Sequence, residues 1–553
     1  MNYSISLEGK RFPLPRPADY AKEEKRIAKL VAEKRGQGFE IVVVMGLGFV
    51  GAVMAAVVAD SVDKKTGRPG KFVIGKQRPS NRSGWKIPYL NQGRSPVKAE
   101  DPEVAAMIRR CVKEKKTLIA TFTDDAIRHA DVIIVDIQCD YVKESLGDLS
   151  TGAVEMKDLE ESFRIIGRYM PPQALCLIET TVAPGTTERV AYPILKRAFQ
   201  LRGIQTPPRV AHSYERVMPG RNYVASIRDF WRVAAGVDAE SRRRVEKFLR
   251  EVIHTDRFPL TILDRPIESE TAKIVENSFR AAILAFMDEW SRFAEEAGVD
   301  LAKVVQAIKV RPTHSNLMFP GPGVGGYCLP KDGALGVWAY RHLLGGREKL
   351  FKFTPQAINI NDTRALHVVE LTGQALGEMK KKVKGAKVLL LGCSYREDLG
   401  DTRYAGAELI VRKLTEQGAS VSVHDPYVER WWEFERQGDY PHQTHSLARF
   451  FKRQSRLKKL KVLKNLRPAL KGMDAVIFAV RHQQYLKLSP EQVVKPAGRP
   501  LAVVDAFAIL DDDQIRQYLR LGCAVRGMGR GHIPRLKQEL EKPRRGKKKD
   551  SPR

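Results

Sequence analysis

A buried strand, a glycine-rich turn and an apolar helix follow one another at residues 40–60. The strand EIVVVM leads into glycines spaced as GxGxxG, and the helix FVGAVMAAVVAD begins inside that motif. The glycines permit a tight turn and close approach to a pyrophosphate, and the helix N-terminus offers N–H groups to the anion. The segment predicts a dinucleotide-binding α/β domain whose cofactor contacts include Gly46, Gly48, Phe49, Val50 and Gly51.

Further apolar strands alternate with helical patterns along the chain. They lie at 71–75, 131–137 and 174–180, and the rhythm restarts at 386–392, 419–425, 474–480 and 501–507. Glu268 to Ala297 contains no Gly or Pro and has helical spacing, which predicts one long helix. We therefore expect an α/β fold of two Rossmann-like, doubly wound parallel-sheet domains joined by a long central helix. The predicted divisions are an extension at 1–38 with a helix at 21–35, a dinucleotide domain at 39–235, a helical centre at 236–384, a third domain at 385–535 and a tail at 536–553.

The charge distribution and the cysteine content restrict the partners and metals that the protein is expected to bind. The net charge is +30, and half of it comes from the basic runs 449–467 and 542–553. The first run suits either an amphipathic helix that contacts an anionic surface weakly or a solvated insertion, and the tail is expected to be disordered. The six cysteines are scattered without zinc-ligand spacing, so no metal is expected. We expect no nucleic-acid partner. Without a membrane span or a signal peptide, we expect a cytoplasmic protein.

The loop PGPGVGGYCLPKD at 320–332 is too rich in Gly and Pro for a helix or strand. Cys328 near its end is a candidate nucleophile, because nearby cations favour the thiolate. We interpret Cys111, Cys176 and Cys523 as small buried residues. Lys273 and Asn277 are four residues apart and share one face of the long helix. Their spacing alone fits an ordinary exposed polar pair at least as well as a catalytic one.

These motifs resemble the UDP-glucose/GDP-mannose dehydrogenase family from about residue 40 to residue 535. The loop GPGVGGYCLPKD resembles the family's nucleophile loop, and ETAKIVENSFRA resembles its central catalytic helix. ETTVAPGTTE at 179–188 resembles the turn beside the nicotinamide, and GCSYREDLGDTR at 392–403 resembles the segment that contacts the nucleotide sugar. The ending RGMGRGH also has family counterparts. SYERVMPG and GVGGYC resemble the branch that acts on UDP-N-acetylhexosamines.

The resemblance implies a four-electron oxidation of a nucleotide-sugar hydroxymethyl group to a uronate, with NAD and a cysteine thioester. It also implies a homodimer, or a higher even oligomer, through the long helix. By resemblance Cys328 is the nucleophile, Glu215 is a general acid or base, and Lys273 and Asn277 stabilise oxyanions. Thr181 and Asp332 organise a water. The implied substrate contacts are Glu215, Lys273, Asn277, Gly325, Arg396 and Arg403, and further cofactor contacts are Gln77, Arg78, Thr181 and Lys331.

Three positions depart from the family. The second strand should end in an acid for the ribose, yet Lys76, Gln77 and Arg78 follow it, so NAD, NADP or both remain open. Gln138-Cys139-Asp140 stands where a Thr-Pro pair is common, and Arg396 replaces a lysine. Two alternatives stay open: a 3-hydroxyacid or phosphogluconate type of dehydrogenase, and a catalytically inactive anion-binding relative.

Overall fold

The computed structural model describes residues 2–6, 8–347, 350–435, 447–451 and 454–542. The chain forms two compact units. The first unit consists of Met1–Val142, Ala153–Glu276 and Ala334–Lys349, and the second of Lys143–Gly152, Asn277–Gly333 and Leu350–Arg553. Among the described helices, none combines the length and the apolar character that crossing a bilayer requires.

An eight-stranded sheet is the centre of the first unit, in the order β12-β11-β10-β9-β6-β3-β4-β5. All its neighbouring strands are parallel except β10 and β11, so the expectation of a parallel sheet is wrong for that one pair. The strands are β3 (Glu40–Met45), β4 (Lys71–Lys76), β5 (Leu118–Thr121), β6 (Val132–Val135), β9 (Leu175–Ile178), β10 (Arg209–His212), β11 (Arg232–Gly236) and β12 (Leu260–Ile262).

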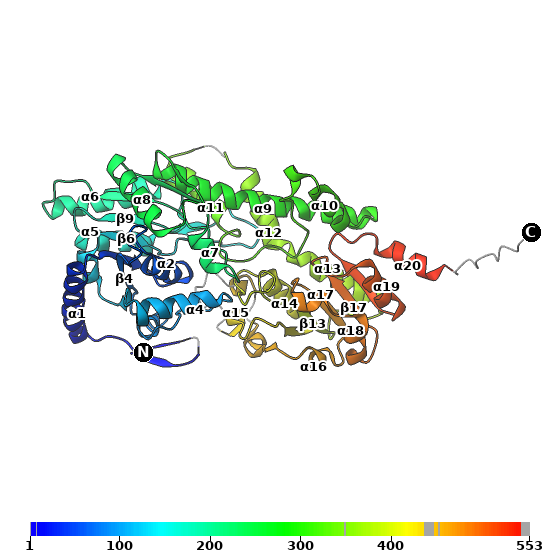
Figure 1. The fold of residues 1–553 in the computed structure, drawn as a ribbon. Helices are drawn as coiled ribbons and strands as arrows, with labels where there is room; N and C mark the ends of the chain where they lie inside the picture. Colours follow the sequence, from blue (N-terminus) through cyan, green and yellow to red (C-terminus); the bar gives the residue numbers. More distant parts are fainter. Residues whose placement is uncertain (1, 7, 348–349, 436–446, 452–453, 543–553) are drawn as a thin grey trace, which may run out of the picture. The chain divides into compact units, whose positions relative to one another are not determined.

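Helices cover this sheet because its strands are buried runs of Val, Ile and Leu. Val42 and Val44 of β3 belong to a core that includes residues of α2, α4, α7 and α8. Figure 1 shows α1, in dark blue, running beside the blue strands of the sheet, and Ile27 and Val31 of α1 are buried. The helices are α1 (Pro17–Gly36), α2 (Phe49–Asp60), α3 (Lys86–Asn91), α4 (Pro102–Arg109), α5 (Lys157–Tyr169), α6 (Tyr192–Leu201), α7 (Tyr223–Arg228) and α8 (Ala239–Val252).

Two antiparallel hairpins accompany the sheets. Strands β1 (Tyr3–Ile5) and β2 (Arg11–Pro13) form the N-terminal hairpin, and β7 (Asp140–Val142) pairs with β8 (Ala153–Glu155). The extension that the sequence predicts at 1–38 is thus ordered in its described residues.

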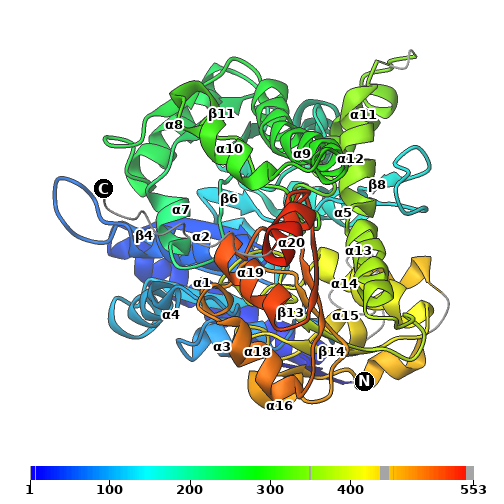
Figure 2. The ribbon, with the colours of Figure 1, turned by 90° about the vertical axis from the view of Figure 1, so that its right-hand side faces the viewer.

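The second unit contains a six-stranded, wholly parallel sheet in the order β15-β14-β13-β16-β17-β18. Val388 and Leu390 of β13 belong to one core and Leu389 and Leu391 to another, as the alternation of side chains along a strand requires. Figure 2 shows α13, α14 and α15 on one side of this sheet and α16, α18 and α19 on the other. The strands are β13 (Lys387–Leu391), β14 (Ser420–His424), β15 (Val462–Leu463), β16 (Ala475–Phe478), β17 (Ala502–Asp505) and β18 (Ala524–Gly527).

The predicted long helix is α9 (Pro266–Ala297). Its first turns, up to Glu276, belong to the first unit and the rest to the second. The later helices are α10 (Leu301–Lys309), α11 (Asp332–His342), α12 (Phe353–Thr363), α13 (Ala365–Glu378), α14 (Gly406–Glu416), α15 (Trp432–Glu435), α16 (Leu466–Leu470), α17 (Gln483–Leu486), α18 (Pro490–Ala497), α19 (Asp512–Arg520) and α20 (Ile533–Glu541).

Three sequence expectations need correction. The boundary at 235 is wrong, because it cuts β11 and leaves β12 outside the sheet to which it belongs. The amphipathic helix at 449–467 is wrong for the described residues: short 3-10 turns precede edge strand β15, and Leu457 is buried. The disordered tail cannot begin at 536, because α20 continues to Glu541; residues 543–553 lie outside the described residues.

Candidate functional site

The glycine motif after β3 has the geometry that a pyrophosphate needs. Gly46 has φ +99°, which glycine tolerates and other residues rarely adopt. A Cβ on Gly51 would lie 1.9 Å from the Gly46 carbonyl oxygen, so only glycine fits there, whereas nothing lies within 4 Å of a Cβ on Gly48. Helix α2 begins at Phe49 and has no side-chain cap on Gly48. Open backbone at a helix N-terminus fits a dinucleotide phosphate.

The end of β4 carries an amide where the fingerprint normally places an acid. Gln77 Oε1 accepts a hydrogen bond from the Leu47 N–H at 2.9 Å, within the glycine motif. Lys76, the last residue of β4, is buried and pairs with Asp124, which follows the neighbouring strand β5. Arg78 is exposed and lies 3.5 Å from Asp158. Gln77 is therefore the one of these three that contacts the dinucleotide motif.

Lys273 and Glu215 meet inside the first unit. The Lys273 ammonium donates a hydrogen bond of 2.8 Å to the Glu215 carbonyl oxygen and lies 3.6 Å from its Oε1. Lys273 and Asn277 are only 6% and 7% exposed, so the interpretation of an ordinary exposed pair is wrong. Glu215 follows β10, and its Oε2 accepts from the Val217 N–H. A buried acid and a buried ammonium in contact can move a proton or stabilise an oxyanion.

Sequence reasoning missed a group of buried charges in the same unit. Glu179, just after β9, pairs with Arg232 of β11 at 2.6 Å, and both are 1% exposed. Burial raises the pKa of Asp136 well above its ordinary value, and the nearby Glu179 and Glu215 raise it further. The Asp136 carboxylate would lie 3.1 Å from a Cβ on Gly51. Glu179 opens the motif ETTVAPGTTE, so its place before a sharp turn was the available signal.

Glu270, on the first turns of α9, holds the turn at 183–187. Its carboxylate accepts hydrogen bonds from the Gly185 N–H at 2.5 Å and from the N–H and hydroxyl of Thr187 at 2.8 and 2.6 Å. Burial raises the pKa of Glu270 to about 7. Thr181 is half-buried in the same connection, after β9. Because β3, β6 and β9 are parallel, their carboxyl ends place this turn and the glycine motif on one edge of the sheet.

In the second unit, the Cys328 loop packs directly on the segment 395–404. A Cβ on Gly325 would lie 2.6 Å from both Tyr395 Cβ and the Tyr404 carbonyl oxygen. The Gly326 N–H donates to the Arg403 carbonyl oxygen at 2.8 Å. Side chains at these glycines would push the two segments apart. The structure therefore brings together two motifs that lie about 70 residues apart in the sequence.

Asn277, Lys331 and Asp332 form one buried network. Asn277 Nδ2 donates to Asp332 Oδ2 at 2.7 Å, and Lys331 Nζ donates to Asp332 Oδ1 at 2.7 Å. The N–H of Asp332 also donates to the Cys328 carbonyl oxygen at 2.9 Å. Cys328 is half-buried just before α11, and Lys331 faces the ring of Tyr327 at 4.4 Å. Lys331 is 1% exposed and engaged with Asp332, which does not favour its expected cofactor contact.

Arg403 is held by a bidentate pair with Asp401. Its Nε and Nη2 donate to the Asp401 oxygens at 3.0 and 2.6 Å, and the guanidinium lies 5.7 Å from the Tyr327 ring centre. Burial alone would lower the pKa of Arg403, but Asp401 raises it above the usual value, with smaller effects from Tyr395 and Cys328. Arg396 is half-buried nearby in sequence. A permanent cation beside the Cys328 loop suits an anionic substrate.

Sequence models of three domains of one family match the chain in order. They are the NAD-binding domain at residues 40–253, the central domain at 267–363 and the UDP-binding domain at 389–512 of the UDP-glucose/GDP-mannose dehydrogenase family. The chain belongs to this family. It is an NAD-dependent nucleotide-sugar dehydrogenase that oxidises CH–OH groups and forms uronates. The fold class and the cofactor NAD expected from the sequence are confirmed.

Individual relatives have similar lengths. A UDP-N-acetyl-D-mannosamine dehydrogenase of Pyrococcus horikoshii is 27% identical over 89% of this chain and all of its own length. A UDP-N-acetyl-D-glucosamine 6-dehydrogenase of Pseudomonas aeruginosa is 26% identical over 86% of this chain and 98% of its own. The crystal structure of an NDP-N-acetyl-D-galactosaminuronic acid dehydrogenase from Methanosarcina mazei is 28% identical, with a TM-score of 0.71 over 92% of this chain and 98% of that one.

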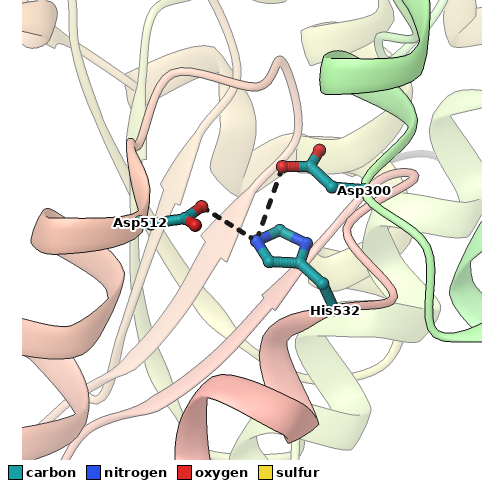
Figure 3. Close-up of side chains that lie close together, drawn as sticks. All are labelled: Asp300, Asp512 and His532. Atoms are coloured by element: carbon teal, nitrogen blue, oxygen red, sulfur yellow. Dashed lines mark hydrogen bonds and ion pairs between the residues drawn. The ribbon is translucent and has the colours of Figure 1, made fainter.

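The nucleotide-sugar dehydrogenase also contains a histidine between two carboxylates, away from Cys328 in sequence. His532 Nε2 lies 3.5 Å from Asp300 Oδ2 and 3.2 Å from Asp512 Oδ1 (Figure 3). Among the described residues it is the one group whose ligand atoms lie close enough for a metal. Arg530 and Lys303 already pair with these carboxylates, at 3.5 and 2.6 Å. We interpret the group as structural: the two carboxylates hold His532 and so fix the segment RGMGRGH in place.

Proposed function

We propose that this chain oxidises the hydroxymethyl group of a UDP-N-acetylhexosamine to a carboxylate through a thioester on Cys328. The substrate class is supported by the relatives, which are dehydrogenases of UDP-N-acetyl-D-mannosamine and UDP-N-acetyl-D-glucosamine. The observation that carries the proposal is the packing of Gly325 and Gly326 on residues 395–404, within the UDP-binding domain. A thiol beside a nucleotide-binding segment suits chemistry on the attached sugar.

The proposed reaction removes two hydrides from one carbon. The alcohol loses a hydride and a proton and becomes an aldehyde. The Cys328 thiolate then forms a C–S bond to the aldehyde carbon, and the thiohemiacetal loses the second hydride and becomes a thioester. Water adds to the thioester, the C–S bond breaks, and the carboxylate and the free thiol are released. Bound NAD supplies the hydride acceptor for both oxidations, one molecule for each.

The remaining assignments follow the charges that develop. Each tetrahedral species carries an oxyanion, for which the Lys273 ammonium and the Asn277 amide are suitable donors. Glu215, in contact with Lys273, is assigned as the acid or base that exchanges protons with the substrate and with water. Asp332 and Thr181 are assigned to position the hydrolytic water. In this proposal Arg403 and Arg396 hold the substrate's anionic groups.

We also propose that the enzyme is a dimer or a higher even oligomer through α9. Four aromatic side chains on this helix are 44–57% exposed, although they are large and apolar: Phe279, Phe286, Trp290 and Phe293. Their spacing keeps them on one side of the helix, as a/d positions do in a helix seam. On the neighbouring α10, Val304 and Ile308 are each 39% exposed. Several large apolar side chains exposed on one side of a helix are typical of a subunit interface.

The thioester is tested by trapping it. In Glu215→Gln, loss of the acid–base group should slow hydrolysis, so mass spectrometry of the intact protein should show substrate attached at Cys328 after exposure to NAD and a UDP-N-acetylhexosamine. Cys328→Ser should form no acid, and Cys523→Ser, at a buried cysteine, should behave like the parent protein. A Glu215→Gln protein that still oxidises but never carries an adduct would exclude the thioester.

The same assay separates the alternatives. A dehydrogenase that transfers one hydride would keep its activity in Cys328→Ser, and an inactive anion-binding relative would show no turnover before any substitution. A panel of UDP- and GDP-sugars, followed by the absorbance of the reduced cofactor, identifies the preferred hexose.

A further inference from the structure

The loop after β4 carries a neutral amide and basic side chains where a typical NAD ribose site carries an acid. Gln77 stands in the acid's place, and both ends of its amide are engaged: Oε1 accepts from the Leu47 N–H at 2.9 Å, and Nε2 donates to Ser83 Oγ at 3.1 Å. A carboxylate in this place would accept bonds from the ribose hydroxyls and repel a 2′-phosphate. A neutral amide cannot repel it.

Lys86, at the start of α3, brings a cation to the same backbone. Its ammonium donates to the Leu47 carbonyl oxygen at 2.8 Å. Burial lowers the pKa of Lys86 to about 8, and among the described residues no carboxylate pairs with it. A half-buried ammonium whose hydrogen bond among the described residues goes to a neutral carbonyl is poorly compensated. An anion bound beside Leu47 would supply the missing charge.

The whole stretch 76–99 is basic. It contains six Lys or Arg and no Asp or Glu. Lys76 is paired with Asp124, and Arg78 lies 3.5 Å from Asp158 but keeps 72% of its side chain exposed. Ser80 and Ser83 lie 2.8 Å apart through their hydroxyl oxygens, and the Ser83 hydroxyl lies within 3.1 Å of the Arg78 carbonyl oxygen. Cations together with hydroxyl donors are the groups that bind phosphate oxygens.

The N-terminal hairpin fixes this loop in place. Ser4 Oγ of β1 donates to the Asn81 carbonyl oxygen at 2.9 Å. Gly84 packs so closely that a Cβ there would lie 2.7 Å from Leu14 Cδ2. Phe12 of β2 meets the edge of Tyr89 on α3 with ring centres 5.4 Å apart. A loop that is already ordered loses less conformational freedom when it binds a ligand.

We propose that residues 77–86, held by the N-terminal hairpin, form a subsite for the 2′-phosphate of an adenine dinucleotide. The enzyme then accepts NADP alongside NAD, with discrimination between them of less than about tenfold, equivalent to ~1.4 kcal/mol. This inference rests on the dinucleotide site assigned to Gly46–Gly51. Arg78 and Lys86 would bind the phosphate, and Gln77 would permit its approach.

Equilibrium binding measures the subsite without turnover. The purified full chain is titrated calorimetrically with adenosine 2′,5′-bisphosphate and with 5′-AMP, which differ only in the 2′-phosphate. We expect the bisphosphate to bind several-fold more tightly, and by no more than about tenfold, as one charge-assisted phosphate contact at an open loop allows. Gln77→Asp should abolish this gain and leave 5′-AMP binding unchanged or stronger, and the exposed Arg78→Ala should reduce the gain without affecting folding. Lys458→Ala, at an exposed lysine of the second unit, is the charge-matched control.

The outcomes separate the two assignments. If 5′-AMP and NAD bind but the bisphosphate gains nothing over 5′-AMP, the subsite is excluded and the dinucleotide site stands. In that case Asp140 is the next candidate for the missing negative charge. If neither NAD nor 5′-AMP binds, the dinucleotide site itself is wrong.

Discussion

At the scale of single residues, the side chains that we propose as catalytic are buried. Lys273, Asn277 and Asp332 all have exposures below 8%, and each contacts another polar side chain of its own unit. A side chain that is desolvated but satisfied by hydrogen bonds has a fixed orientation, which a catalytic group needs.

Lys273→Met should remove the ammonium with little change in side-chain volume. Because loss of one oxyanion donor costs roughly 100- to 1,000-fold in kcat, we expect a fall of that size with the sugar nucleotide still bound. Steady-state kinetics and calorimetric binding of the substrate measure the two effects. A kcat within about threefold of the parent value would remove Lys273 from the mechanism.

Glu270 should make stability depend on pH. Its pKa is 4.5 in the reference state and about 7 when folded, so the folded protein retains the proton that the unfolded chain releases. The contribution of Glu270 to the free energy of unfolding is therefore fully present below pH 4.5. It decreases as the pH rises towards 7, by roughly 3 kcal/mol at most. Glu270→Gln cannot titrate, so the difference in unfolding free energy between parent and variant should change across this window.

Urea unfolding at a series of pH values measures that difference. Glu289→Gln, at an exposed position of the same helix, is the control. A parent-to-variant difference that stays constant from pH 4.5 to 7 would contradict the raised pKa.

At the scale of elements, the strands whose side chains are apolar and fully buried could be predicted from the sequence. Apart from the charged first residues of β3 and β13, the strands β3, β6, β13 and β16 are wholly apolar, and the sequence places them within a residue or two. RVAH and LTI, at β10 and β12, are short and partly polar, so hydrophobic pattern alone misses them. The exposure of Lys273 and the partners of Glu179 depend on tertiary packing, which spacing cannot show.

Helix α9 should hold subunits together through its aromatic stripe. Phe286→Glu with Trp290→Glu places charges in the proposed apolar interface, and their desolvation should dissociate the oligomer. Light scattering should then give a particle near the 62.3 kDa chain mass, while Glu289→Ala remains assembled. A parent protein that already scatters as a 62.3 kDa particle at micromolar concentration would exclude the interface.

At the scale of the whole molecule, the basic segment 449–467 has a structural role that its charge does not indicate. It supplies the edge strand β15, and Lys464 donates to the carbonyl oxygens of Asp425 and Val428 at 3.1 and 2.7 Å. Deleting the segment would therefore damage the second sheet. The sequence revealed its charge but not its place in the sheet, because the basic residues conceal a strand of only two residues.

Neutralising the exposed Lys458, Lys459 and Lys461 tests the segment without removing it. Because these side chains are exposed and precede the edge strand, their replacement by Gln should leave kcat/KM within about twofold and weaken adsorption to anionic vesicles. Turnover assays and vesicle sedimentation measure the two effects. A fall in turnover of the folded triple variant would place the segment in the catalytic machinery.

The close approach of Gly325 to Tyr395 and Tyr404 means that two distant stretches of sequence can change only together. Neither stretch can be exchanged with that of a relative by itself, since a bulkier residue on one side would meet backbone on the other. Engineers who wish to graft a different nucleotide preference onto this scaffold must therefore transplant residues 320–328 together with 395–404. A chimera that takes only one of the two segments from a relative would combine surfaces that do not fit each other.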